Sequence, residues 1–253
     1  MKRQRYERTD VPKGGTRGAI LGLIALVIIA VGGWFLVQTL WAKARFDSAK
    51  GDAELVSSVS GTPELKSVDG YTVSDHSFNN TLILIVDDVD AEAPVLSDAR
   101  ILSLDITAGT ATMVILPTNV RVNPETNPQI LSDLFADSGA SPCVNAIERR
   151  CGIPLDHIIV TDAVGWESIR ALDGKGAQEL VKRLSDLLDR VHTDMDASAI
   201  NELNERVQAI GFANVAQVDM RPGSEWTDGD SVSWMVVYDY EVGPAIGYLV
   251  PAA

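Results

Sequence analysis

The sequence lacks the short motifs of several common catalytic mechanisms. It contains no Gly-Xaa-Ser-Xaa-Gly elbow, no phosphate-binding Walker loop and no Cys-His spacing of a zinc site. Its three histidines, His76, His157 and His192, lie far apart in the chain. His157 follows a Gly-Ile-Pro-Leu-Asp turn, where a structural hydrogen bond is the simpler interpretation. The sequence therefore gives no support to a serine hydrolase, a P-loop NTPase or a zinc enzyme.

Cysteine is scarce, since Cys143 and Cys151 are the only two. Ser141 and Pro142 are typical of a helix start, as N-cap and first helical residue, and a helical period then continues to Gly152. Eight helical residues separate two Cα atoms by about 12 Å, beyond the roughly 7 Å limit of a disulfide. We therefore favour two buried thiols over a disulfide, the alternative that an oxidising compartment permits.

Charge is absent from residues 18–41, GAILGLIALVIIAVGGWFLVQTLW. A helix of this length spans the ~30 Å apolar core of a bilayer. Six basic residues precede the segment and three follow it closely, which predicts a cytoplasmic N-terminus and an extracytoplasmic C-terminal domain. A cleaved signal peptide is the alternative, but the apolar run is long for a signal core and no strong small-residue cleavage site follows it. We expect a single-pass protein of the cell membrane, anchored in the lipid bilayer by residues 18–41.

Positive charge is scarce beyond this segment. Residues 42–253 contain 15 basic and 33 acidic residues, a formal charge of −18. Such a field argues against a nucleic-acid partner and against adhesion to anionic headgroups through a basic face. It also makes a pyrophosphate harder to bind, unless metal ions or local arginines reverse the field.

The chain divides into four regions. They are a basic cytoplasmic tail at 1–17, the transmembrane helix at 18–41, a polar stalk or linker at 42–73, and an extracytoplasmic domain at 74–253. The domain is expected to have strands at 80–87, 100–106, 111–116, 156–160, 215–220 and 232–238. Helices are expected at 141–151, 164–172, 175–191 and 197–210, with Asp196 or Ser198 as the cap of the last. This alternation predicts an α/β/α sandwich around one mixed sheet, in which the apolar run 80–87 is a central strand buried on both faces.

Five short motifs follow one another along this domain. They are the strand 80–87 ending in Asp87, then Leu96-Ser97-Asp98, Leu116-Pro117-Thr118-Asn119, Ile130-Leu131-Ser132, and CGIPLDHIIVTDAVGWESIRAL at 151–172. Their order resembles the LytR-CpsA-Psr (LCP) family of bacterial cell envelopes. In that family, a strand ending in Asp precedes Arg-Ser-Asp, Ile-Pro-Arg-Asp, Lys-Ile-Asn and Gly-Ile-Pro-Ile-Asp-His. Residues 191–226 also look like the closing helix and strand of the family, so the resemblance covers about residues 74–240.

The resemblance implies a membrane-anchored transferase. Family members move a glycopolymer from a polyprenyl pyrophosphate carrier to peptidoglycan, with arginines on the pyrophosphate, aspartates around Mg²⁺ and an apolar groove for the lipid. Fixed cations and a metal ion both suit this chemistry, because they stabilise the charge of the departing group. By matched position, Asp87 and Asp98 are the implied metal ligands, with Asp88 and Asp90 beside the first.

The chain departs from the family pattern at its positive charges. Uncharged residues replace family cations at Val89, Leu96, Thr118, Ile130 and Gly176. A segment that carries a paired-arginine strand is missing between residues 172 and 173. We therefore expect a smaller sheet, with the helix at 175–191 packed over the space of the pyrophosphate. Four arginines could substitute for the missing cations, namely Arg100, Arg121, Arg149 and Arg150, but none falls in a matched position, and a solvated surface role is favoured for each.

Two hypotheses of function remain. The favoured one is a pseudoenzyme, a binding or regulatory module that binds a polyprenyl-linked glycan, peptidoglycan or an active LCP homologue. The alternative is an active phosphotransferase whose arginines come from elsewhere in the fold or from a partner chain. The fold alone does not separate the two.

Overall fold

The computed structural model describes residues 51–60, 68–122, 129–174, 189–221, 224–227, 233–237 and 239–252. These residues form a six-stranded mixed sheet with the order β8-β7-β2-β3-β4-β9. The strands are β2 (Phe78–Val86), β3 (Leu96–Asp105), β4 (Thr110–Leu116), β7 (His157–Asp162), β8 (Val191–Thr193) and β9 (Ala216–Asp219). The helices are α2 (Ala53–Val59), α3 (Leu131–Ser138), α4 (Ala140–Cys151), α5 (Ala163–Arg170), α7 (Ala197–Ile210) and α8 (Asp239–Ala245), with a short 3-10 helix at Phe212–Asn214.

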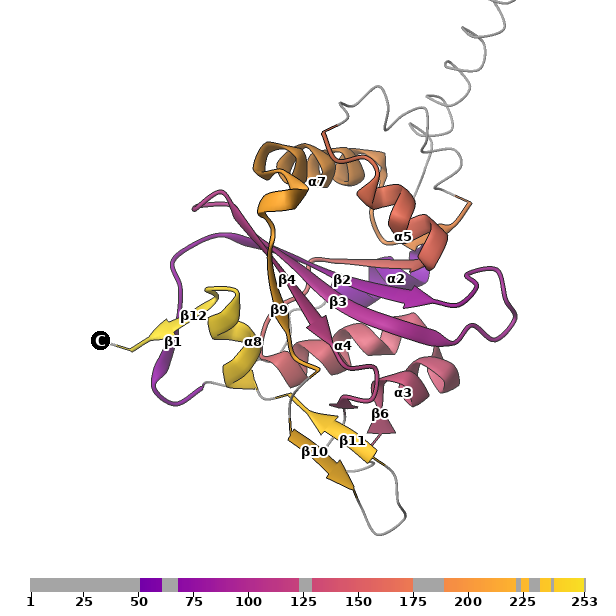
Figure 1. Ribbon diagram of the computed structural model, residues 1–253, viewed down its shortest axis with the longest axis horizontal. Coiled ribbons are helices and arrows are strands. Elements are labelled where there is room, and N and C mark those ends of the chain that lie inside the picture. The colour runs from indigo at the N-terminus through magenta and orange to yellow at the C-terminus, as the bar shows by residue number, and fades with distance from the viewer. Residues whose placement is uncertain are drawn as a thin grey trace, which may run out of the picture.

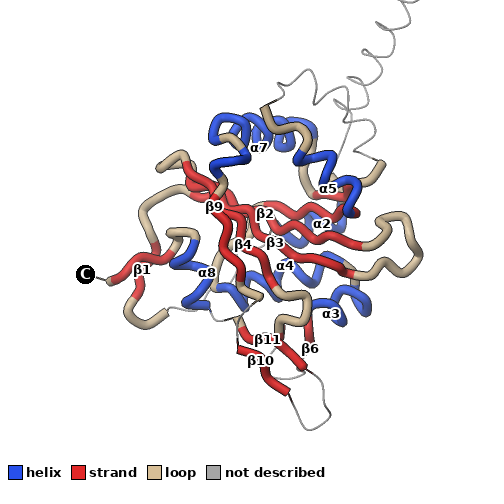
Figure 2. The backbone as a smooth tube through the Cα atoms, viewed as in Figure 1, coloured by secondary structure: helices blue, strands red, loops and turns tan. Residues whose placement is uncertain are grey.

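The helices form a layer on each side of the sheet (Figures 1 and 2). Helices α5 and α7 lie above it in this view, and α3 and α4 lie below it. Three two-stranded ribbons stand outside the main sheet: β1 (Tyr71–Val73) with β12 (Leu249–Pro251), β5 (Arg121–Val122) with β6 (Gln129–Ile130), and β10 (Ser224–Thr227) with β11 (Ser233–Val236). The predicted α/β/α sandwich around one mixed sheet is thus confirmed for the described chain.

Strand β2 occupies the middle of the sheet, as its continuous apolar sequence predicts. It pairs in parallel with β7 and antiparallel with β3, and its residues from Asn80 to Val86 are all buried. Strands β3 and β4 form the predicted hairpin, closed by Gly109 at a φ of 67°. Glycine is favoured at this turn because it has no Cβ to oppose a left-handed backbone.

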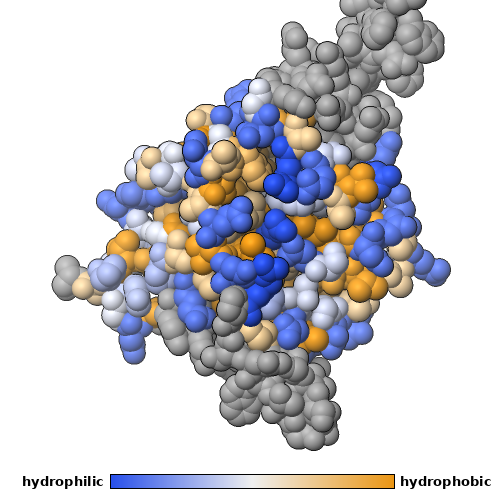
Figure 3. All heavy atoms as spheres, in the orientation of Figure 1, coloured by the Kyte–Doolittle hydropathy of each residue, from blue (hydrophilic) through white to orange (hydrophobic). Residues whose placement is uncertain are grey.

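Alternate residues of β2 supply two separate apolar cores. Leu82 and Leu84 face the first core, between the sheet and α4, whereas Ile83 and Ile85 face the second core, between the sheet and helices α5 and α7. This division follows from the two-residue period of a strand. On the outside, hydrophilic and apolar side chains are interspersed over the face drawn in Figure 3. The second core, between the sheet and α5 and α7, is the one that holds the pocket described below.

The predicted helices match α4, α5 and α7 closely, but the start of α4 differs. Its N-cap is Gly139, at a φ of 76°, so Ser141 and Pro142 lie inside the first turn and not at the cap and first position. The reason is that α3 ends at the preceding residue and Gly139 makes the sharp link between the two helices. Cys143 and Cys151 are buried thiols, as expected, and burial raises the pKa of Cys143 to about 12.

The predicted helix at 175–191 falls mostly outside the described residues, and with it the expected cover over the pyrophosphate space. Its last three residues are wrong, because residues 189 and 190 form a turn and a bend and Val191 begins strand β8, where it pairs with Thr161 of β7. Helix α7 begins where predicted, and Asp196 caps it by accepting a hydrogen bond from Ala199 N at 2.9 Å.

Helix α2 lies in the segment for which the sequence predicts a stalk. Asp52 caps this helix by accepting from Glu54 N, and Leu55 is 5% exposed within the core under α4. This part of the segment therefore packs on the domain. The predicted transmembrane helix at 18–41 lies outside the described residues, and among the residues that are described no helix is long and apolar enough to cross a bilayer.

Candidate functional site: an apolar pocket bordered by ion pairs

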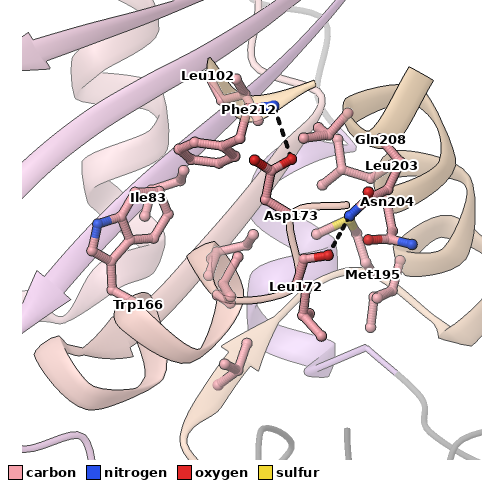
Figure 4. Close-up of a pocket in the computed structure, with 15 residues that line it drawn as sticks. Ile83, Leu102, Trp166, Leu172, Asp173, Met195, Leu203, Asn204, Gln208 and Phe212 are labelled. Atoms are coloured by element: carbon pink, nitrogen blue, oxygen red, sulfur yellow. Dashed lines mark hydrogen bonds between the residues drawn. The ribbon is translucent and has the colours of Figure 1, made fainter. Parts of the chain in front are cut away.

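An apolar pocket lies between the sheet and helices α5 and α7 (Figure 4). Ile83 of β2 and Leu102 of β3 line it on the sheet side, and Trp166, Leu203 and Val207 line it on the helical side. Its cavity volume of about 120 Å³ is roughly ten times what one buried water needs. Because nearly all of its wall is hydrocarbon, the space suits an apolar chain better than water.

Three polar residues, Asp173, Asn204 and Gln208, border this pocket, and Figure 4 draws the hydrogen bonds that join Asp173 to Phe212 and Gln208 to Leu172. Asp173 accepts a hydrogen bond from Phe212 N at 3.1 Å. The side chain of Gln208 donates to Leu172 O at 2.7 Å and accepts from Gly174 N at 2.8 Å. These bonds fix the turn that follows α5 against α7. The border therefore contains one carboxylate and the amides of Gln208 and the third residue, Asn204, and none of the described residues that line the pocket is cationic.

Two aromatic rings form a second border. The ring centroids of Trp166 and Phe212 lie 6.3 Å apart in an edge-to-face arrangement. The Arg100 guanidinium carbon lies 5.2 Å from the centroid of Trp166, and that of Arg170 lies 6.0 Å from Phe212. Both distances are within the range of a cation–π interaction. Two cations thus pack on the outer sides of rings that line the pocket.

The arginines on the elements around the pocket are paired with carboxylates. The nitrogen–oxygen distances are 2.5 Å for Arg100–Asp98, 2.9 Å for Arg170–Glu167, 2.6 Å for Arg190–Asp162, 2.5 Å for Arg206–Glu202 and 2.6 Å for Arg221–Asp219. The hydrogen bonds from Arg221 lower the pKa of Asp219 to about 2, so this pair stays charged at physiological pH. Each pair carries no net charge, so the described residues around the pocket include no unneutralised cluster of arginines like the one that the family resemblance implies.

The two predicted metal ligands have other partners. Asp87 follows β2, and its Oδ1 accepts hydrogen bonds from Val95 N and Asp88 N, both at 2.8 Å. These backbone amides hold the pKa of Asp87 below its usual value. Asp98 lies in β3 beside Arg100. No group of three or more metal-ligating side chains occurs in the described part of the chain, so these residues do not fit an all-protein magnesium site. The assignment of Asp87 and Asp98 as metal ligands stays a prediction.

The turn at Pro117, Thr118 and Asn119, which matches a family motif, serves as a backbone junction. The carbonyl of Pro117 accepts from Val120 N at 3.0 Å, and that of Thr118 accepts from Ser132 N at 2.9 Å. The carbonyl of Asn119 accepts from Met235 N at 3.0 Å. The turn therefore ties the end of the hairpin to α3 and β11.

The remaining predicted candidates lie away from the pocket. Arg149 and Arg150 belong to the last turn of α4, in the layer on the other face of the sheet, and Arg121 belongs to the β5–β6 ribbon. His157 makes a hydrogen bond to Asp194 at 2.9 Å, in line with the structural role expected for it.

Sequence reasoning missed the pocket and the part that Arg100 plays beside it. The available signal was weak: Trp166 lies in the most specific motif, and the apolar period of 197–210 shows that one face of α7 must be buried. Neither pattern reveals that the two surfaces leave a cavity between them.

The fold is shared with solved structures at low sequence identity. The transcriptional regulator yvhJ from Bacillus subtilis has a TM-score of 0.52 and 14% identity, covering 69% of this chain and 96% of its own. B. subtilis TagV has a TM-score of 0.51 and 11% identity, with the same coverage. The LytR-CPS2A-psr family protein YwtF (TagT), solved with bound octaprenyl pyrophosphate lipid, has a TM-score of 0.50 and 12% identity, covering 79% of this chain and 94% of its own.

Comparisons of sequence alone find nothing similar, since no protein-family model matches this chain and no curated protein matches it significantly. The structural likeness is at low identity and therefore establishes the fold, not the activity. The described chain has the LytR-CpsA-Psr fold that its motifs predict.

Proposed function

We propose that this chain is a membrane-anchored, extracytoplasmic binding module of the bacterial cell envelope, which holds the apolar chain of a polyprenyl-linked lipid and does not transfer a glycan. The observation that carries the proposal is the apolar pocket between the sheet and helices α5 and α7. A solved structure of the same fold contains octaprenyl pyrophosphate, which supports a lipid of this class as the ligand. The segment 18–41 anchors the domain beside the membrane in which such lipids reside.

The absence of transfer follows from the charges. Transfer from a pyrophosphate carrier requires cations that stabilise the departing phosphate. Uncharged residues such as Leu96 and Thr118 replace family cations. The arginines on the elements around the pocket are neutralised by the carboxylates beside them. A binding or regulatory role, with peptidoglycan or an active homologue as a further partner, needs none of the missing groups.

The alternative of an active phosphotransferase rests on one contact. Arg100 lies beside Asp98, so a cation is present next to a position that the family uses for its metal. If substrate or Mg²⁺ drew Asp98 away, this guanidinium would become available to a phosphate oxygen.

Binding is tested with the full chain in lipid nanodiscs and a radiolabelled polyprenyl lipid. Leu203→Trp fills the pocket and should reduce binding at least tenfold, because the apolar chain loses its space. Ala209→Trp is the matched control, since it adds the same side chain at an exposed position of the same helix. Equal binding by both variants would contradict the proposal.

Catalysis is tested separately with the same protein, a polyprenyl-pyrophosphate glycan, peptidoglycan and Mg²⁺. We expect binding without release of polyprenyl phosphate. Turnover that Leu203→Trp abolishes would instead establish the phosphotransferase alternative.

A further inference from the structure

The pocket has two polar borders, and among the residues that the structure describes neither border offers net positive charge. At the first border, the side chains that line the pocket are the Asp173 carboxylate and the uncharged amides of Asn204 and Gln208. At the second, Arg100 and Arg170 pack on the outer sides of Trp166 and Phe212. A headgroup that left the pocket at either border would therefore meet a carboxylate or an arginine that already has a carboxylate partner.

The pairing of Arg100 is close. Its Nε and Nη2 both donate to Asp98 Oδ2, at 2.9 and 2.5 Å. The two residues are held side by side on one strand, because Asp98 pairs with Ile85 and Arg100 with Ile83, and both of those isoleucines face the second core. Two donors on one edge of the guanidinium are thus committed to the carboxylate, and its central carbon lies 5.2 Å from the centroid of the Trp166 ring.

These contacts favour a hydroxyl headgroup over a pyrophosphate headgroup. A pyrophosphate that displaced Asp98 from Arg100 would leave a partly buried carboxylate without its partner, which costs free energy. A pyrophosphate that lay near the exposed Asp173 carboxylate would be repelled by its charge. A hydroxyl needs only one or two neutral hydrogen bonds. Asp173 accepts hydrogen bonds, and the amides of Asn204 and Gln208 both donate and accept, so the first border can satisfy an alcohol.

We propose that the pocket selects the uncharged alcohol form of a single-chain isoprenoid over the same chain carrying a pyrophosphate. This inference rests on the proposed function, since it names the chemical form of the lipid that the same pocket binds. The site would then respond to the amount of dephosphorylated carrier lipid, whose only polar group is a hydroxyl.

The test is a competition assay on the full chain in nanodiscs, with EDTA present so that no divalent cation bridges phosphate to carboxylate. The competitors are a polyprenol, its monophosphate and its pyrophosphate, all of one chain length. We expect the alcohol to bind at least tenfold more tightly than the pyrophosphate, a difference of about 1.4 kcal/mol. Equal or tighter binding of the pyrophosphate would overturn the selection while leaving lipid binding intact. Failure of all three lipids to bind would overturn the proposed function itself.

Two charge variants identify the cause of the selection. Asp98→Asn removes the anion that neutralises Arg100, and Asp173→Asn removes the carboxylate from the other border while keeping an acceptor for Phe212 N. At least one should tighten pyrophosphate binding by about threefold to tenfold, the scale of one charge-assisted hydrogen bond gained or one repulsion removed. Glu202→Gln is the control, because it removes the partner of Arg206 at an exposed position of α7. An unchanged preference in both charge variants, or the same change in the control, would refute the proposed cause.

Discussion

The guanidinium of Arg100 lies 5.2 Å from the centre of the Trp166 ring, although 66 positions of sequence separate the two residues. This contact joins strand β3 to helix α5, two elements that no local sequence pattern predicts to be in contact. Trp166 is 5% exposed and also lines the pocket, so the same side chain supports the second core and bounds the cavity. Changes at this contact should therefore affect stability and ligand binding together.

The first prediction concerns the energy of this contact. Trp166→Ala should reduce the free energy of unfolding by about 3–5 kcal/mol, because it removes a large buried ring. A double-mutant cycle of Arg100→Ala and Trp166→Leu should give a coupling of about 0.5–1 kcal/mol, as expected for a partly exposed cation–π pair. Urea unfolding of residues 42–253 measures both values. A coupling indistinguishable from zero would mean that the ring and the guanidinium are neighbours without attraction.

The second prediction concerns Gly165, at the start of α5. Alanine usually stabilises a helix relative to glycine, by about 1 kcal/mol. Here, however, an added Cβ would lie 2.2 Å from Thr161 Oγ1 and 3.3 Å from the carbonyl oxygen of Arg190. The clash should reverse the sign, so that Gly165→Ala destabilises the fold by about 1–3 kcal/mol. Thermal unfolding tests this, and adding Thr161→Ala should recover part of the loss; a more stable Gly165→Ala protein would refute the predicted clash.

Local patterns were sufficient to predict most of the sheet and the long helices. The apolar residues of the run 80–87 predicted a central strand, and in β2 the residues from Asn80 to Val86 are all buried. The apolar period of 197–210 and its cap at Asp196 predicted the bounds of α7 as observed. These features depend on neighbours in sequence, which is the information that a periodic pattern contains.

Features that depend on distant pairing could not be predicted in this way. Tyr71 pairs with Pro251 across nearly the whole domain, and β8 has only three residues, too few for a period to be seen. The ion pair of Asp98 with Arg100, in contrast, joins near neighbours on β3, but the matched family motif implies a metal ion, and not an arginine, as the partner of Asp98. The identity of a carboxylate's partner is a property of the fold and not of the motif.

The third prediction concerns pH and the buried Glu148. This side chain is 3% exposed and accepts a hydrogen bond from Leu155 N at 2.9 Å. Burial raises its pKa above the usual 4.5, the nearby Asp156 acts in the same direction, and together they outweigh the hydrogen bond. Between 4.5 and the raised value the folded state binds more protons than the unfolded state, so the free energy of unfolding falls as pH rises through this window.

Glu148→Gln should remove this contribution while keeping the acceptor for Leu155 N. We expect the variant to be at least as stable as the parent at pH 7 and to lack the loss of stability that Glu148 causes as pH rises above 4.5. Urea unfolding at a series of pH values gives the free energy of unfolding of the parent and of Glu148→Gln as functions of pH. Subtracting one curve from the other cancels the effect of all other carboxylates. Glu202→Gln, on the exposed side of α7, should leave the curve of the parent unchanged. Parallel curves for parent and Glu148→Gln would show that burial does not perturb this carboxyl.

The last prediction separates the two roles open to Asp87. In the structure its Oδ1 holds the loop after β2 by accepting hydrogen bonds from Val95 N and Asp88 N. An amide oxygen can accept the same two bonds, so Asp87→Asn should keep the shape of the loop, whereas Asp87→Ala loses both bonds and loosens it. A magnesium ligand, in contrast, needs the negative charge that both variants remove. In a complementation assay with cells lacking the gene, we therefore expect Asp87→Asn to support normal growth, with export and folding checked by surface proteolysis. If Asp87→Asn were folded, exported and yet inactive, the carboxylate would be acting through its charge, and the phosphotransferase alternative would replace the binding module.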